Sequence, residues 1–233
     1  MPVPVFDESE WLRIIQRPDW YADYMQLAER AKKELGKDKL DELNKRVRHF
    51  FEKALLENKV NLGVDGPDFD AERRPVDTVV IHHTSAQPGY RLSYLNAVHL
   101  LNIYSPVFAG PEYLGRPIWS GHFRDGGQTF WGYHWIARMD GTFERLLNDD
   151  QIGWHAGNWN INRRSIGICL DNDYENQNPD GDLLKKLAKH IRKNYPRAKI
   201  IGHCESREGT ICPGSNFLEK WKPMLLKYLT DEP

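Results

Sequence analysis

Histidine and cysteine side chains occur at the ends of two short apolar runs in this sequence. The adjacent His82 and His83 follow the first run, and His203, Cys204 and Cys212 follow the second. Imidazole and thiolate groups are zinc ligands, and a catalytic zinc site uses three protein ligands and keeps a fourth position open. Water bound at that open position loses a proton near neutral pH. The two units therefore indicate a hydrolytic zinc site built from histidine and cysteine.

Short strands must bring these two units together. The hydrophobic pattern predicts strands at residues 77–82, 132–138, 143–147, 165–170 and 199–202. Helices are predicted at residues 92–104, 183–191 and 217–228. An Asp140-Gly141 turn joins two of the strands as a hairpin. Strands that alternate with helices, plus one hairpin, predict an α/β fold with a mixed central β-sheet flanked by helices.

The N-terminal part of the chain is typical of a helical extension. Residues 20–60 repeat apolar side chains at helical spacing, with a break at Gly36 and with Asp38 placed to cap a second helix. The expected division is an N-terminal helical extension, a linker and a catalytic domain, at residues 1–60, 61–74 and 75–233. The apolar faces of the helices favour a brace packed on the catalytic domain over a segment that binds a partner or another external surface.

Residues 105–131 form the longest stretch without a clear periodic pattern. They are rich in glycine, proline and aromatic residues. A loop of this length inside a compact domain is usually functional or disordered. We expect it to form one wall of a cleft, or a lid.

Composition narrows the class of protein. The net charge of −1 provides no overall field for nucleic acid or an anionic membrane surface. The apolar runs are too short for a transmembrane segment, and residues 1–7 lack the basic and apolar regions of a secretory signal. The three cysteines, Cys169, Cys204 and Cys212, are a poor disulfide framework and fit a reducing compartment or a thiolate that binds metal.

A series of motifs over about residues 75–230 resembles the zinc-dependent N-acetylmuramoyl-L-alanine amidases of type 2. This is the fold shared by peptidoglycan recognition proteins and bacteriophage amidase lysozymes. Each motif alone is weak, whereas their order and spacing together are specific. The motifs are His82-His83-Thr84-Ser85, Gly132-Tyr133-His134-Trp135, Asp140-Gly141, His155-Ala156-Gly157, Asn162-Arg163-Arg164-Ser165-Ile166-Gly167-Ile168, Gly202-His203 and Cys212-Pro213-Gly214.

The resemblance implies the ligand set and two catalytic residues. His82, His203 and Cys212 match the zinc ligands of the family, for one Zn²⁺ per chain. Tyr133 matches a tyrosine that faces the metal, and Thr210 stands where some members have a lysine. Successive side chains on a strand face opposite ways, so His83 and Cys204, which adjoin ligands, are expected to turn into the core.

The resemblance also implies a groove for substrate. His155 matches a groove histidine, and Asn162, Arg163 and Arg164 flank the strand that follows it. Arginine suits the carboxylates of a peptidoglycan stem peptide, since its guanidinium can make bidentate contacts. Cys169 stands where the cytoplasmic recycling amidases have a glutamate, which argues against that subgroup and leaves the general base open.

The activity implied is hydrolysis of the amide between N-acetylmuramic acid and L-alanine, with peptidoglycan or muropeptides as the partner and no nucleic acid or membrane span. The alternatives are a non-catalytic peptidoglycan-binding module and a zinc peptidase that cuts another cell-wall amide. A cytoplasmic enzyme, an endolysin-like protein exported without a classical signal, and the mature form of a secreted protein all fit the sequence. The pattern does not indicate an oligomeric state.

Overall fold

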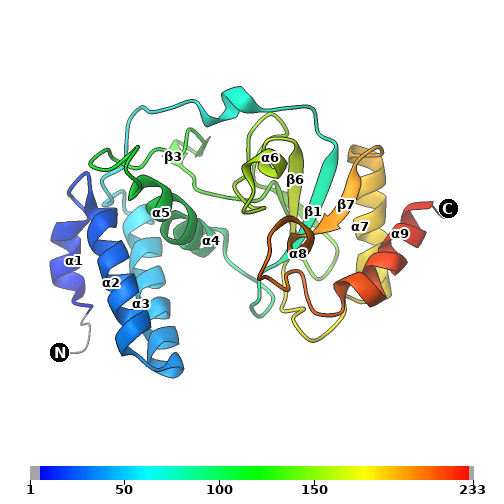
Figure 1. Ribbon diagram of the computed structural model, residues 1–233, viewed down its shortest axis with the longest axis horizontal. Coiled ribbons are helices and arrows are strands. Elements are labelled where there is room, and N and C mark those ends of the chain that lie inside the picture. The colour runs from blue at the N-terminus through cyan, green and yellow to red at the C-terminus, as the bar shows by residue number, and fades with distance from the viewer. Residues whose placement is uncertain (1–5, 231–233) are drawn as a thin grey trace. The chain divides into compact units, whose positions relative to one another are not determined.

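The computed structural model describes residues 6–230, which form two compact units (Figure 1). The helical unit contains residues 6–68 and 91–130. The sheet unit contains residues 69–90 and 131–230. Within residues 6–230, no helix combines the length and the hydrophobicity that crossing a membrane would require.

The sheet unit is built on a mixed five-stranded β-sheet with the order β5-β4-β6-β1-β7. Its strands are β1 (Thr78–His83), β4 (Trp135–Ala137), β5 (Phe143–Arg145), β6 (Ser165–Leu170) and β7 (Lys199–Gly202). Neighbouring strands are parallel except β5, which pairs antiparallel with β4 through the predicted hairpin. The predicted mixed α/β fold is confirmed.

Helices cover one face of this sheet (Figure 1). The helical segments of the unit are a 3-10 turn (Phe69–Glu72), α6 (Trp159–Asn162), α7 (Gly181–Asn194), α8 (His203–Ser206), a π-turn (Phe217–Trp221) and α9 (Lys222–Thr230). Apolar side chains of α7 and α9, such as Leu187 and Leu225, pack on Ile81 and Ile168 of the sheet. Because strand side chains alternate, this packing leaves His82 and Cys169 on the opposite face.

The helical unit contains α1 (Glu8–Ile14), α2 (Trp20–Glu34), α3 (Lys37–Leu56), α4 (Leu92–His99), a π-turn (Leu100–Tyr104), α5 (Ser105–Phe108) and the short strands β2 (Phe123–Arg124) and β3 (Gly127–Gln128). Helix α3 packs on α4, and α2 packs on α5. The buried Glu52 carboxylate on α3 accepts hydrogen bonds from Arg91, at 2.7 and 3.0 Å, and from Ser93 at 2.6 Å. These charge-assisted bonds lower the pKa of Glu52 to about 2, although burial alone would raise it.

The compact units do not follow the sequential division expected at residues 1–60, 61–74 and 75–233. Residues 91–130 group with the N-terminal helices because α3 packs on α4 and Glu52 of α3 pairs with Arg91, just before α4. The expected linker is ordered at its start, where the Gly63 N–H donates to the Ile118 carbonyl at 2.8 Å.

Local details of the helical unit also differ from expectation. Helix α1 was not predicted, and its N-cap is the Asp7 carboxylate, which accepts from the backbone N–H groups of Ser9 and Glu10. Asp38 does not cap α3, since that helix begins one residue earlier, after Gly36. Residues 105–131 are irregular in part but include α5 and the β2–β3 hairpin.

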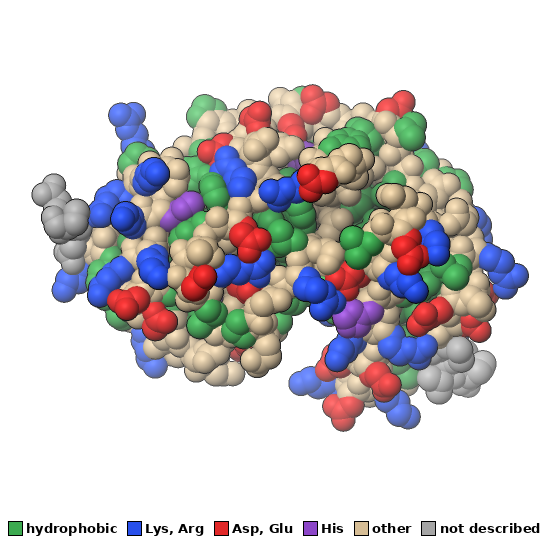
Figure 2. Space-filling model, turned by 180° about the vertical axis from the view of Figure 1, so that it is seen from behind, with side chains coloured by type: hydrophobic (Ala, Val, Ile, Leu, Met, Phe, Trp, Pro, Cys, Tyr) green, Lys and Arg blue, Asp and Glu red, His purple; other side chains and the backbone are tan. Residues whose placement is uncertain are grey.

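Charged side chains of both signs are interspersed on the face seen in Figure 2. This distribution agrees with the net charge of −1. A single-sign field of the kind that attracts nucleic acid is not evident on this face.

A buried histidine should make the helical unit sensitive to acid. His99 on α4 is 5% exposed, and burial lowers its pKa to about 3. In the unfolded chain His99 takes up a proton with a pKa near 6.5, whereas in the folded chain it stays neutral down to about pH 3. The free energy of unfolding therefore falls as the pH drops from 6.5 toward 3. Between pH 6.5 and about pH 5 we expect His99 to contribute a loss of about 2 kcal/mol. Urea unfolding at both pH values should show a smaller loss for His99→Gln and His99→Leu than for the wild type. Equal losses in all three proteins would contradict the assignment.

Candidate metal centre and active site

The three predicted ligands converge at one edge of the sheet. Ile81 on β1 is the parallel partner of Gly202 on β7, so His82 and His203 leave neighbouring strands at the same level. Cys212 reaches them from the loop after α8, with its Sγ 3.9 Å from Nδ1 of His82. One nitrogen from each histidine and this sulfur all lie within 4.8 Å of one another. Within the described residues, no other group of His, Cys, Asp or Glu is so placed.

The geometry of this cluster fits a zinc ion. Ligand atoms of a tetrahedral zinc lie roughly 3.3–3.8 Å apart, given bonds of about 2.0–2.3 Å, so a small contraction of the cluster would suffice. Nε2 of His203 is buried and has no hydrogen-bond partner in the described part of the chain. A buried polar atom without a partner is costly, and metal binding is one way to remove that cost. Two imidazoles and a thiolate are also a donor set that zinc prefers.

Burial sets the protonation states at the cluster. It lowers the pKa of His203 to about 4, helped by the positive charge of Arg207, so the imidazole is neutral and can donate a lone pair. Burial raises the pKa of the Cys212 thiol to about 12, although a hydrogen bond from the His83 backbone N–H acts to lower it. A thiolate at Cys212 therefore needs a nearby cation, and a divalent metal would supply it.

The side chains of His83 and Cys204 turn away from the cluster, the first by alternation along β1 and the second from helix α8. Nδ1 of His83 accepts the Tyr174 N–H at 2.9 Å, and the imidazole is buried. Cys204 packs against the core on the helix-covered face. Neither side chain belongs to the ligand cluster.

Tyr133 and Thr210 lie beside the cluster. The ring of Tyr133 is 4.8 Å from that of His82, centroid to centroid. Burial raises the pKa of Tyr133 well above its usual range, so the phenol keeps its proton and can donate a hydrogen bond. The Thr210 hydroxyl accepts the Cys212 N–H at 3.2 Å, which leaves its own proton for another acceptor.

His155 contacts the imidazole of His82, and its predicted contact with substrate stays a prediction. It is buried, with Nδ1 3.0 Å from Nε2 of His82 and Nε2 3.3 Å from the Ser165 hydroxyl. Gly167 makes room for the ring, because a Cβ at that position would come within 2.8 Å of it. A hydrogen bond to the second nitrogen of a ligand histidine fixes its tautomer and orientation. With Nε2 of His82 engaged by His155, Nδ1 faces Cys212.

The three residues expected to flank the groove are held by the protein itself. Asn162 is buried and accepts the Ala156 N–H at 2.8 Å, which fixes the loop that carries His155. The Arg163 guanidinium lies 3.4 Å from Glu72. The Arg164 guanidinium donates to Asp77 at 2.6 Å. Substrate contacts for these residues stay predictions.

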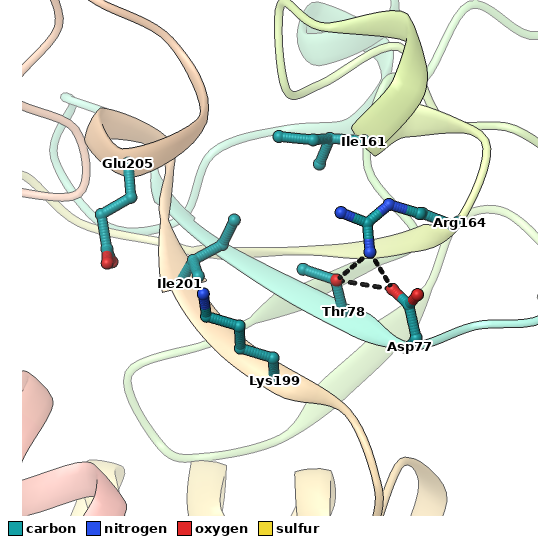
Figure 3. A pocket seen from close by; sticks show the side chains of 7 residues that line it. All are labelled: Asp77, Thr78, Ile161, Arg164, Lys199, Ile201 and Glu205. Atoms are coloured by element: carbon teal, nitrogen blue, oxygen red, sulfur yellow. Dashed lines mark hydrogen bonds and ion pairs between the residues drawn. The ribbon is translucent and has the colours of Figure 1, made fainter.

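Arg164 lines a cavity of about 430 Å³ in the sheet unit (Figure 3). The other lining residues are Asp77, Thr78, Ile161, Lys199, Ile201 and Glu205. In Figure 3 the Arg164 guanidinium points toward Asp77 and Thr78, and Ile201 lies between this pair and Glu205. The cavity therefore combines charged groups of both signs with apolar side chains.

Two residues near the site were not predicted to act there. His134 is buried, accepts the Gly167 N–H through Nδ1 at 3.0 Å, and has Nε2 3.0 Å from the Gln151 carbonyl. Cys169 is the strand partner of His82 and is fully buried. Strand alternation places Cys169 on the same face as His82 once the register is known, whereas no local pattern identifies the role of His134.

Comparison with known proteins identifies the family of this chain. The family model for N-acetylmuramoyl-L-alanine amidase matches residues 72–215. The endolysin of Enterobacteria phage K11 is 31% identical over 98 residues, which cover 39% of this chain and 62% of the endolysin. The endolysin of Klebsiella phage KP32 is 27% identical over 99 residues, with coverages of 39% and 64%. The matched stretch thus spans less than two thirds of either relative.

Solved structures with a similar fold include two endolysins. The N-acetylmuramoyl-L-alanine amidase LysCS from Clostridium intestinale has a TM-score of 0.48 at 21% identity, covering 72% of this chain and 91% of its own. The Ph2119 endolysin from Thermus scotoductus bacteriophage Ph2119 has a TM-score of 0.47 at 20% identity, with coverages of 68% and 87%. The family match extends over more than half of the sequence, and the chain belongs to the N-acetylmuramoyl-L-alanine amidase family.

Proposed function

We propose that this protein is a zinc-dependent amidase that hydrolyses the bond between N-acetylmuramic acid and L-alanine in peptidoglycan or muropeptides. The observation that carries the proposal is the convergence of His82, His203 and Cys212 within 4.8 Å. Membership of the amidase family supports the choice of substrate. An endolysin-like role is supported by the two phage relatives, with the protein made in the cytoplasm and acting on the wall without a classical signal.

In this mechanism His82, His203 and Cys212 hold one zinc ion. The zinc, when bound, would polarise the scissile carbonyl and activate the attacking water. His155 supports the site indirectly: its hydrogen bond to Nε2 of His82 keeps Nδ1 of that ligand available. Asn162 supports His155 in turn, because it accepts a hydrogen bond from the backbone of the next residue, Ala156.

Tyr133 and Thr210 are proposed to stabilise the negative charge that develops on the substrate oxygen. Two observations support this role for Tyr133: its phenol is protonated, and its ring lies against that of the ligand His82. Thr210 is oriented by the Cys212 N–H, which uses the acceptor side of its hydroxyl. Donors that are already oriented in a water-poor site stabilise such an oxyanion without reorganisation.

The stem peptide is proposed to run past Arg163 and Arg164. Both guanidinium groups have carboxylate partners, Glu72 and Asp77, and both are partly exposed. A substrate carboxylate would therefore compete with, or add to, an existing ion pair. The cavity beside Arg164 gives such a group a place to enter.

The alternative functions make different predictions for the same digest. Purified peptidoglycan incubated with the zinc-loaded protein should release intact stem peptides with a free L-alanine amino terminus and leave glycan chains with free lactyl carboxylates, as read by mass spectrometry. New amino termini inside the peptide would instead identify a zinc peptidase. Binding to peptidoglycan without any new product would identify a non-catalytic binding module. The His82→Ala variant, treated with zinc in the same way, is the control for background hydrolysis.

A further inference from the structure

Cys169 is a buried thiol on the site face of the sheet that the amidase mechanism has not used. It lies on the central strand β6, between β4 and β1, and its direct strand partners are Ile136 and His82. Parallel partners in register present their side chains on the same face, so the thiol lies beside the imidazole of a proposed metal ligand. Its side chain is 0% exposed.

The phenol of Tyr133 donates a hydrogen bond to Sγ of Cys169, whose own S–H donates to the Leu170 carbonyl oxygen at 3.9 Å. Tyr133 also packs its ring on His82 at 4.8 Å. The phenol is thus fixed on two sides, by the imidazole ring next to it and by the sulfur at its tip. A tyrosine can rotate about two side-chain bonds, so two contacts are needed to define where its oxygen lies.

We propose that Cys169 is a positioning residue that holds the Tyr133 hydroxyl in place for the developing oxyanion. The proposal rests on the amidase function proposed above. The thiol is both a weak donor and a weak acceptor. In the free protein the thiol can accept a hydrogen bond from the phenol O–H. When the phenol O–H turns to the substrate, the thiol S–H can donate a hydrogen bond to the phenol oxygen.

An ionised glutamate at this strand position could accept a hydrogen bond from the phenol, but it could not donate one to the phenol oxygen. A thiol is small, uncharged and adapted to an apolar strand position. Cys169 can therefore support the phenol oxygen while Tyr133 donates its hydrogen bond to the substrate.

Two substitutions at Cys169 separate hydrogen bonding from packing. Cys169→Val keeps an apolar side chain of similar size but removes the donor and acceptor. Cys169→Ser keeps a donor and acceptor but loses volume and apolar surface. If Cys169 positions Tyr133, the valine variant should lose about 3- to 10-fold in kcat with KM unchanged, and the serine variant should stay within about twofold of the wild type. If Cys169 acts only by packing, the serine variant should lose more kcat than the valine variant.

The same substitutions in a Tyr133→Phe background test whether Cys169 acts through the phenol. There the valine and serine variants should have equal kcat values, because no hydroxyl remains to be positioned. A valine loss that is as large in this background as in the wild type would overturn the proposal. So would a serine variant slower than the valine variant in the presence of Tyr133.

An infrared measurement on the zinc-free protein tests the contact without relying on activity. Tyr133→Phe should shift one S–H stretching band, and the band that shifts should be the one that Cys169→Val removes. No shift on Tyr133→Phe would overturn the proposed contact even if the valine variant fails to fold. A wild-type protein that releases no stem peptides would refute the amidase function, and the infrared result would still decide whether the hydrogen bond exists.

Discussion

Cys212→Ser should abolish amide hydrolysis and reduce bound zinc from about one per chain to a trace. The reason is the ligand chemistry: a neutral hydroxyl is a far poorer zinc ligand than a thiolate. The two histidines would remain, but a third ligand would be missing from a cluster whose atoms lie within 4.8 Å. Metal analysis after zinc reconstitution and dialysis, combined with release of stem peptides, provides the measurement.

Cys204→Ser is the matched control for this substitution. Cys204 is close in the sequence but packs against the core, away from the ligand cluster. It should retain its zinc and its activity, apart from some loss of stability. Full zinc content in Cys212→Ser, or loss of zinc in Cys204→Ser alone, would show that the ligand set is wrong.

Tyr133→Phe should lower kcat by about 10²–10³-fold while the zinc content stays unchanged. The substitution keeps the aromatic ring against His82 and removes only the hydroxyl. Burial keeps the wild-type phenol protonated, so the ratio of wild-type to variant kcat should not change with pH around neutrality. Steady-state kinetics on a defined muropeptide, with metal analysis of the same sample, tests both parts.

Tyr195→Phe gives the comparison for a tyrosine with a structural hydroxyl. Tyr195 accepts a hydrogen bond from Trp135 at 2.8 Å and donates one to Asp149 at 2.8 Å, in the sheet unit but outside the ligand cluster. Its loss should lower the melting temperature with little change in kcat. If Tyr133→Phe instead behaved like Tyr195→Phe, the catalytic role of Tyr133 would be refuted.

The sequence alone defined the strands that carry the site and the chemistry of its residues. The apolar runs before His82 and His203 are local patterns, and the strands formed from them lie within a residue or so of the predicted bounds. Alternation along β1 was also sufficient to turn His83 away from the cluster, whereas Cys204 lies on helix α8 and its orientation depends on that helix. Such features depend on neighbours in the chain, which is why a single sequence contains them.

Only the tertiary structure decided which distant side chains meet. The sequence could place His155 in a loop, but the hydrogen bond to His82 depends on where that loop crosses the sheet. Arg163 and Arg164 could be recognised as cations, whereas their pairing with Glu72 and Asp77 joins segments far apart in the chain. Residues 91–130 likewise joined the N-terminal helices through the buried Glu52, whose partner Arg91 no local pattern identifies. In each case the energy comes from burial and pairing across the fold, so the sequence determined the chemistry available and the folded chain determined which groups it brought together.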